Sequence, residues 1–156
     1  MSEQYWLMKS EPFKYPFGQL LKDRRTTWDG VRNFEARNNL RGMKIGDLAL
    51  FYHSNEGKEI VGVVRVAREA YPDPTAPGED WSVVDVEPVA SLKAPVALEV
   101  IKSDPALADI ALLKRSRLSV VPVSKAHFEH LLALAKTKLP AAAKTAKKAA
   151  AARDKS

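Results

Sequence analysis

Residues 28–38 read WDGVRNFEARN and join a polar loop to the start of a predicted helix. Asn33 is a favourable N-cap residue for a helix over residues 34–43, whose apolar residues recur at helical spacing. In the loop before it, Gly30 allows a ligand to approach the backbone closely, and Trp28 offers an aromatic face. The stretch therefore places aromatic, amide and adaptable backbone groups side by side at the entry to a helix.

Short apolar and aromatic runs on both sides of this stretch are typical of strands. Their alternation with short helices is too irregular, and the strands follow one another too closely, for a doubly wound nucleotide-binding fold. We expect an α+β fold, built as a small mixed β-barrel or sheet with short helices around it. The predicted strands are 5–10, 48–54, 60–67, 81–87, 96–101 and 118–123, and further helices are predicted over 17–23, 105–113 and 124–135, the last one capped by Ser124.

The chain has 156 residues, of which 46% are hydrophobic, and this is enough for one folded domain with a core. It contains no cysteine, which excludes disulfides, thiol catalysis and cysteine-based metal sites. The N-terminal residues lack the pattern of a signal peptide, and no apolar run approaches the roughly 20 residues that span a bilayer. We therefore expect a cytoplasmic protein that makes no membrane contact.

The net charge of +6 is concentrated at the C-terminus. Residues 136–156 hold seven Lys or Arg residues and one Asp, which leaves 18 charges of each sign in residues 1–135. We expect an electrically neutral domain over 1–135 and a basic, Ala/Lys-rich tail over 136–156 that is disordered or helical. Such a tail either stays solvated without a partner or contacts polyanions non-specifically.

Known catalytic motifs are absent, including the phosphate-binding loop, the dinucleotide-binding glycine pattern and the zinc-protease motif. His127 and His130 share a helical face, but no further ligand pattern completes a metal site. One alternative that stays open is an enzyme acting on a nucleobase or nucleotide, with His53 as the base and Asp47 or Asp85 in support. Another is a module that binds other proteins.

Several polar residues stand next to aromatic ones in a way that indicates a binding pocket. Trp28 supplies an aromatic face, Asn33 can donate and accept hydrogen bonds, and Arg37 follows one helical turn later. Arg117 directly precedes the predicted strand over 118–123, and in an extended chain its side chain points to the same face as that of Ser119. Together these groups suit a planar, hydrogen-bonding ligand that lies near phosphate.

The chain resembles the EVE domain family through several motifs that occur in the family's order. The second of them fits the family pattern W-x-G-V-R-N-[YF]-x-A-R-N, and the set extends over almost the whole predicted domain. The motifs are YWLMKSEP at 5–12, WDGVRNFEARN at 28–38, MKIGD at 43–47, FYHS at 51–54, AYPDPT at 70–75 and SRLSV at 116–120.

This resemblance implies a PUA-like mixed β-barrel related to the YTH and ASCH domains, and a function by binding, without catalysis or a cofactor. The implied ligand is a modified base in DNA or RNA, taken out of its stack and held against an aromatic wall. Trp28 is then the stacking wall, Asn33 reads the base edge, and Trp81 is a second wall. The remaining implied site residues are Ser10, Tyr52, His53 and Ser54 as pocket lining, with Arg37, Asn38, Arg117 and Ser119 as polar or phosphate contacts.

Overall fold

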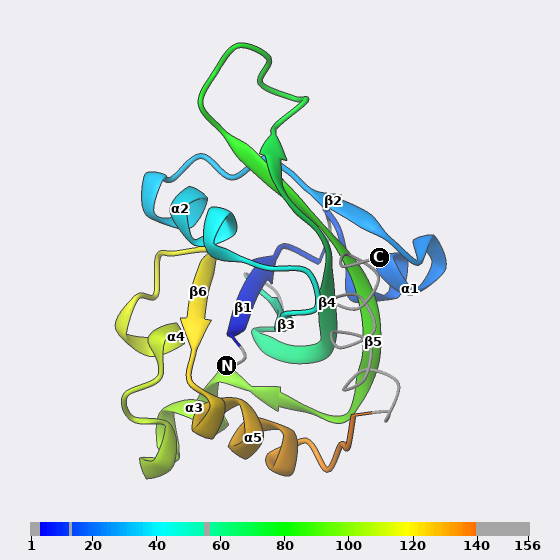
Figure 1. Cartoon of the computed structure of the whole chain (residues 1–156). Helices are drawn as coiled ribbons and strands as arrows, with labels where there is room; N and C mark the ends of the chain where they lie inside the picture. Colours follow the sequence, from blue (N-terminus) through cyan, green and yellow to red (C-terminus); the bar gives the residue numbers. More distant parts are fainter. Residues whose placement is uncertain (1–3, 13, 55–56, 140–156) are drawn as a thin grey trace, which may run out of the picture.

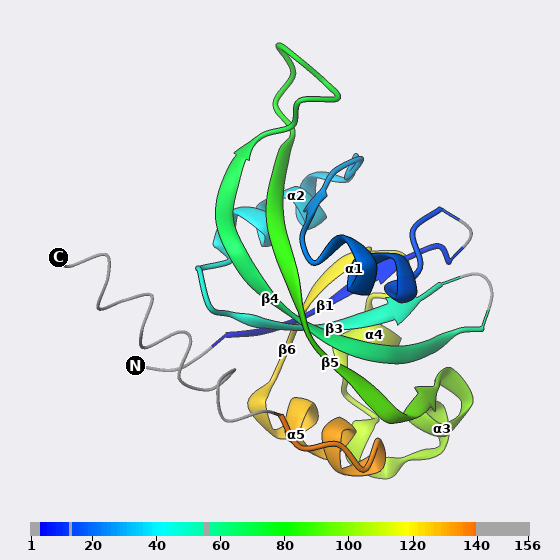
Figure 2. The same ribbon diagram turned by 90° about the vertical axis from the view of Figure 1, so that its right-hand side faces the viewer.

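A six-stranded mixed sheet forms the centre of the computed structural model, which describes residues 4–12, 14–54 and 57–139. The strand order is β2-β5-β4-β3-β1-β6, and the sheet is strongly curved (Figures 1 and 2). Apolar residues of the sheet and the surrounding helices form one core. The predicted α+β class is confirmed. The strands are β1 Tyr5–Ser10, β2 Thr26–Trp28, β3 Leu48–His53, β4 Glu59–Pro72, β5 Ser82–Ala97 and β6 Val120–Val123.

β1 lies between two neighbours and is buried on both faces along its first four residues. It runs parallel to β3 and antiparallel to β6, as the near-continuous apolar run at its start leads one to expect. The parallel register places Lys9 opposite Tyr52 and Ser10 opposite His53. The polar residues at the carboxyl ends of these two strands are thereby brought to the same edge of the core.

β4 and β5 are much longer than the sequence predicts and pair as one long ribbon. In the outer part of the ribbon, adjacent residues such as Arg68 and Glu69 are both exposed. The sequence there lacks the alternation of apolar and polar residues that would indicate a strand. Four shifts of register interrupt the pairing, and bulges of this kind bend a strand pair. The hairpin projects from the body at the end where α2 lies, while α3 and α5 lie at the opposite end (Figures 1 and 2).

The predicted strand over 96–101 is wrong, because β5 ends at Ala97 and helix α3 follows directly. In this helix Ile101 is buried and Val100 is exposed. The two adjacent apolar residues therefore point to different sides of a helix and do not form part of a strand. The N-caps at Asn33 and Ser124 are confirmed. The helical elements are α1 Phe17–Asp23, α2 Phe34–Gly42, α3 Leu98–Ser103, a 3₁₀ turn at Pro105–Leu107, α4 Ala111–Lys114 and α5 Lys125–Leu134.

Three aromatic rings meet in the core beneath the start of α1. Phe51 of β3 contacts Phe17 edge-on at 5.1 Å between ring centroids and Trp28 edge-on at 5.5 Å. The ring of Phe17 lies directly over Gly62 of β4, where a Cβ atom would come within 2.3–2.6 Å of it. Gly62 is therefore required by the close approach of a ring.

Residues 136–139 pack against the body beyond the end of α5. The Thr137 hydroxyl accepts a hydrogen bond from the Lys93 backbone N–H at 2.9 Å, and Leu139 packs against the core. The rest of the predicted tail, from position 140, lies outside the described residues. Within the described part of the chain, no helix has the length and apolar character needed to cross a membrane. The cytoplasmic location stays a prediction.

Candidate nucleic-acid interface

A cavity of about 450 Å³ opens where β1 and β2 end. It brings together Ser10 and Trp28, two residues that the family motifs predict to share one pocket. Its volume falls in the range of small-molecule sites. The lining residues are Lys9, Ser10, Glu11, Lys14, Tyr15, Thr26, Thr27, Trp28, Asp29 and Gly30.

Trp28 forms the aromatic part of this cavity and is held firmly in place. It is the last residue of β2, paired with Val84 of β5, and only 8% of its surface is exposed. Its ring meets Phe51 at an interplanar angle of 87°. The indole therefore contributes to the core with most of its surface and offers the cavity the remainder.

Hydroxyl and backbone groups make up much of the remaining wall. The Ser10 hydroxyl donates to the Tyr15 carbonyl at 2.7 Å, which leaves its oxygen able to accept. The Tyr15 hydroxyl donates to Asp23 at 2.8 Å, and burial is the main reason that the pKa of Tyr15 is raised. Both residues stay neutral at physiological pH, and their oxygens suit the recognition of an uncharged polar ligand.

The charged residues of the cavity balance one another, with two lysines against Glu11 and Asp29. Lys14 forms an ion pair with Glu11 at 3.6 Å. Lys9 is half-buried, which lowers the pKa of its amine, and its Nζ donates to the Ser116 carbonyl at 2.7 Å. A neutral lining of this kind favours a planar polar group over a phosphate, since a phosphate needs a surplus of cations.

A network of polar side chains supports the β2 wall from behind. Asp85 of β5 accepts hydrogen bonds from Tyr71 at 2.6 Å, from Thr27 at 3.0 Å and from Arg25 at 3.1 Å. Burial alone raises the pKa of Asp85, but these hydrogen bonds outweigh it and lower the pKa. Thr27 lines the cavity, so the network fixes one of its walls.

His53 does not have the partners that the enzyme alternative requires. Its Nε2 accepts a hydrogen bond from the Phe17 backbone N–H at 3.1 Å, and burial lowers the pKa of the ring. Asp47 instead accepts from the Trp6 indole N–H at 3.1 Å, and Asp85 belongs to the network described above. In the described part of the chain, neither carboxylate hydrogen-bonds to His53, and no cluster of three or more His, Asp or Glu residues could hold a metal.

Asn33 precedes α2 as its N-cap, and Arg37 and Asn38 lie on α2, beyond the Gly30 end of the cavity. The Asn33 Oδ1 accepts from the Ala36 backbone N–H at 3.0 Å and so serves as the helix cap. Arg37 donates to Asp80 at 3.0 Å and to the side chain of Asn38. These groups lie beside the cavity and do not line it.

Trp81, predicted as a second wall, lies outside the cavity and stacks on Phe34, with 5.2 Å between the ring centroids.

Tyr52 is buried, with 4% of its surface exposed, and its burial raises the pKa of its hydroxyl. Arg117 is exposed on the segment before β6. The same segment reaches the edge of the cavity, because the Ser119 carbonyl accepts a hydrogen bond from the Lys9 backbone N–H at 2.8 Å. Ser54, directly after β3, donates its backbone N–H to the carbonyl of Ser10 at 2.9 Å.

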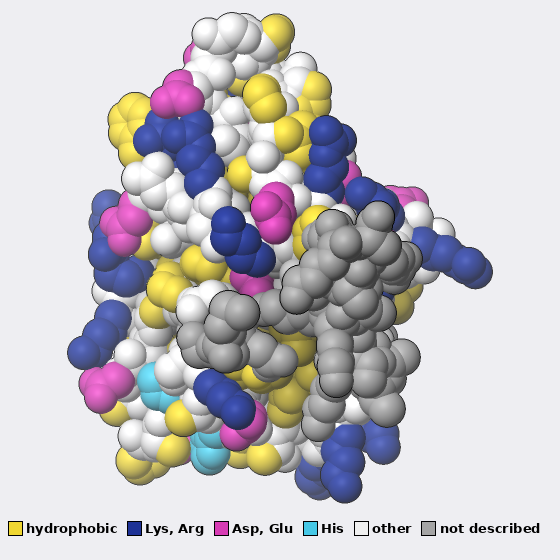
Figure 3. Space-filling model, viewed as in Figure 1, with side chains coloured by type: hydrophobic (Ala, Val, Ile, Leu, Met, Phe, Trp, Pro, Cys, Tyr) yellow, Lys and Arg dark blue, Asp and Glu magenta, His cyan; other side chains and the backbone are white. Residues whose placement is uncertain are grey.

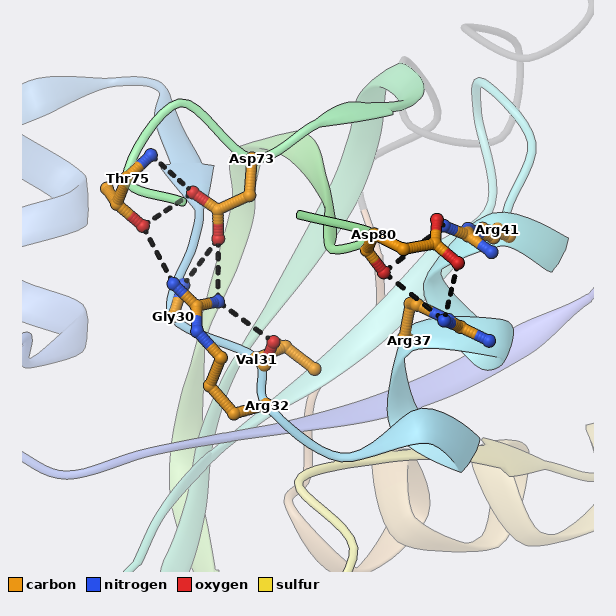
Figure 4. Close-up of polar contacts among 8 residues, drawn as sticks. All are labelled: Gly30, Val31, Arg32, Arg37, Arg41, Asp73, Thr75 and Asp80. Carbon is orange, nitrogen blue, oxygen red and sulfur yellow. Dashed lines mark hydrogen bonds and ion pairs between the residues drawn. The ribbon is translucent and has the colours of Figure 1, made fainter. Parts of the chain in front are cut away.

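A buried carboxylate ties the Gly30 end of the cavity to the β4–β5 hairpin (Figure 4). Asp73 accepts from the Gly30 backbone N–H at 3.2 Å, from Arg32 at 2.9 Å and from the Thr75 side chain at 2.6 Å. Burial raises the pKa of Asp73, but the hydrogen bonds from Thr75, Arg32 and Gly30 together lower it to about 2. The carboxylate is therefore ionised and holds the hairpin against residues 29–32.

Several lining residues were missed by sequence reasoning. Thr26 and Thr27 belong to a strand of only three residues, which is too short to show a period. Lys14 and Tyr15 lie in the turn after β1, and their contact with β2 depends on tertiary structure. The β-branched pair before Trp28 was the available signal for this strand.

Comparisons with known proteins identify relatives of this chain in sequence and in overall fold. The family model of the EVE domain matches residues 4–134. Thymocyte nuclear protein 1 of Mus musculus is 38% identical over 85% of this chain and 74% of its own length. A crystal structure of a protein from Agrobacterium tumefaciens superposes with a TM-score of 0.83 and 42% identity, over 85% of this chain and 92% of the other.

Two further solved structures carry a nucleic acid. The human THYN1 protein in complex with 5-methylcytosine containing DNA has a TM-score of 0.80 and 35% identity, over 87% of this chain and 99% of the other. A YTH domain from Zygosaccharomyces rouxii, solved with N6-methyladenosine RNA, has a TM-score of 0.56 at 14% identity over 86% of this chain and 87% of the other, which is a likeness of fold. The expected likeness of fold to YTH domains is thus confirmed. The chain belongs to the EVE domain family.

Proposed function

We propose that this chain is a non-catalytic reader of a modified base in nucleic acid, with DNA as the polymer to test first. The cavity that joins Ser10 to Trp28 carries the proposal, because it combines an aromatic wall with neutral polar groups. The complex of the human relative with 5-methylcytosine containing DNA supports the choice of polymer and of modification. A base held in such a cavity has left its stack, as in other proteins that inspect single bases.

The first experiment compares binding of two oligonucleotides that share one sequence, with cytosine or 5-methylcytosine at the central position. Duplex and single-stranded forms are measured at two salt concentrations, because binding to phosphates depends steeply on salt. We expect tighter binding of the modified form at both concentrations. Equal affinity for modified and unmodified strands would contradict the assignment of 5-methylcytosine, and the same series with N6-methyladenine then tests another base.

The role of Trp28 is tested with two tryptophans that are similarly buried. Trp28 and Trp6 are 8% and 6% exposed, but only Trp28 lines the cavity. Trp28→Ala should weaken binding of the modified strand roughly 5- to 150-fold, the value of one aromatic–base stack. Trp28→Phe should weaken it less, and Trp6→Phe should leave it unchanged after correction for the folded fraction. A Trp28→Ala protein that folds and binds as wild type would refute the cavity as the base site.

A further inference from the structure

Phe34 exposes an aromatic ring where a folded chain normally buries one. Its surface is 65% exposed, and the other large apolar side chains exposed in the described residues, Leu21 and Val100, are aliphatic and 45% exposed. The ring lies on the first turn of α2. An exposed ring of this kind is a frequent feature of binding surfaces.

The ring of Phe34 is held in a defined orientation by Trp81. The two rings are nearly parallel, with 5.2 Å between their centroids and an interplanar angle of 16°. Trp81 is half-buried at the end of the hairpin tip, just before β5. The Phe34–Trp81 pair, called the ring platform below, is therefore a preformed stack with an exposed outer member.

Arginine side chains surround the ring platform. The Arg37 guanidinium carbon lies 5.0 Å from the Phe34 ring centroid, and that of Arg32 lies 5.7 Å from the Trp81 ring. Figure 3 shows Lys and Arg side chains together with hydrophobic and acidic ones in the region of α2 and the outer part of the hairpin. Arg37 and Arg41 are both paired with Asp80, and Arg32 is paired with Asp73 (Figure 4).

These ion pairs offset the positive charge around the ring platform. A surface whose arginines are already paired contributes less through phosphate neutralisation than through its ring faces. The chemistry that fits it is a flat aromatic partner beside a polyanion, and a nucleobase meets this description. The ring platform is thereby distinguished from an ordinary basic patch.

The ring platform lies next to the cavity along the chain. Gly30 lines the cavity and is four positions before Phe34, so their Cα atoms lie within about 14 Å, the reach of four extended residues. Stacked bases along one strand are separated by about 3.4 Å. The two sites are therefore separated by no more than about four such base steps, which one bound strand can span.

We propose that Phe34, held by Trp81, stacks on a base that flanks the nucleotide bound in the cavity. This inference rests on the proposed function and extends it to a second contact on the same strand. Removal of a base from its stack leaves the adjacent base without a stacking partner. Apolar side chains of other proteins, Phe among them, insert between base steps of nucleic acids. The Phe34 ring supplies that partner.

The test measures affinity for the 5-methylcytosine strand with a series of side chains at position 34. Phe34→Ala and Phe34→Leu should both weaken binding roughly 5- to 150-fold, while Phe34→Trp should retain it, because stacking requires a ring. The slope of affinity against salt should stay unchanged, since no phosphate contact is lost. Val100→Ala, on α3 at the opposite end of the molecule, is the matched control and should bind as wild type.

A fluorescent base analogue reports the stack directly. An oligonucleotide with 2-aminopurine beside the modified cytosine should change its emission on binding wild type and Phe34→Trp, and should not do so to the same extent with saturating Phe34→Leu. Wild-type affinity and emission in Phe34→Leu, with the preference for the modified base intact, would overturn this inference and leave the proposed function standing. Loss of the modified-base preference in the wild type itself would overturn the proposed function and this inference with it.

Discussion

Arg32 donates a hydrogen bond of 2.9 Å to the carboxylate of Asp73, whose side chain has no exposed surface. The pair joins the loop that follows Trp28 to the start of the hairpin tip after β4. Burial of a charge is unfavourable unless hydrogen bonds compensate it, and here two side chains and two backbone N–H groups do so. The pair therefore stabilises the position of residues 29–32 relative to the sheet.

Asp73 should make the stability of the protein depend on pH in the acid range. Its pKa in the folded state is about 2, below the ordinary value of 3.8, so the ionised carboxylate stabilises the fold above about pH 4. That contribution, about 2 kcal/mol, is lost as the pH falls from about 4 through 2. In urea unfolding, Asp73→Asn should be less stable than wild type by about this amount at pH 7, and the difference should shrink toward pH 2.

The control for this measurement is Asp109→Asn. Asp109 pairs with Lys114 on the surface, with 82% of its side chain exposed, and such pairs contribute at most about 1 kcal/mol. A stability difference for Asp73→Asn that stays constant from pH 7 to pH 2 would show that the ionised carboxylate does not stabilise the fold.

Substitutions of Asn33 should separate capping of α2 from recognition of a base. Asn33→Ala removes the cap to Ala36 and should lower the free energy of unfolding by about 0.5–2 kcal/mol, whereas Asn33→Ser keeps a capping oxygen and should stay near wild type. Affinity for the modified strand is then measured for both variants. If Asn33 reads the base edge, both lose affinity alike; full affinity in the Ser variant assigns Asn33 to capping alone.

Gly62→Ala should destabilise the core through the ring of Phe17. The added methyl group would lie 2.3–2.6 Å from ring atoms, and overpacking of this kind costs about 1–3 kcal/mol. Gly18→Ala, in α1, meets nothing within 4 Å and should be neutral or slightly stabilising. In a Phe17→Leu background the cost of Gly62→Ala should decrease, and an unchanged cost there would show that the ring is not its cause.

The basic residues after Leu139 should steepen the salt dependence of DNA binding. A chain that ends at Leu139 lacks five Lys or Arg residues, and each lost phosphate contact makes the slope of log K against log salt shallower by about 0.9 for duplex DNA. A full-length variant with these five residues changed to Gln controls for chain length and should behave like the truncation. An unchanged slope in both proteins would indicate a segment that contacts no phosphate.

The sequence predicts the elements of this fold better than the contacts between them. Local chemistry was sufficient for the caps at Asn33 and Ser124 and for the buried strand from Tyr5, because a cap and a run of apolar residues are recorded in adjacent positions. The outer ribbon near Arg68 was missed, since strand pairing there depends on a partner far along the chain.

In the candidate site, too, the chemistry of single residues is easier to predict from the sequence than their positions relative to one another. Ser10 and Trp28 are far apart in sequence, and the structure places both in the lining of one cavity, while their role in binding stays a prediction. Trp81 has the chemistry of a pocket wall, but its place is decided by the ribbon that carries it to Phe34. Lys14 and Tyr15 line the cavity because of a turn whose orientation no local pattern records.

The hydrogen bonds of Asp73 also fix the spacing between two parts of the candidate binding surface. Through Gly30 and Arg32, one carboxylate holds both the rim of the cavity and the loop that leads to Phe34. These hydrogen bonds thereby fix the cavity rim and this loop relative to each other in the folded chain. An insertion of a single residue between Gly30 and Phe34 would change the spacing between the cavity and the Phe34 ring. One bound strand could then no longer contact both, even if each site kept its own structure.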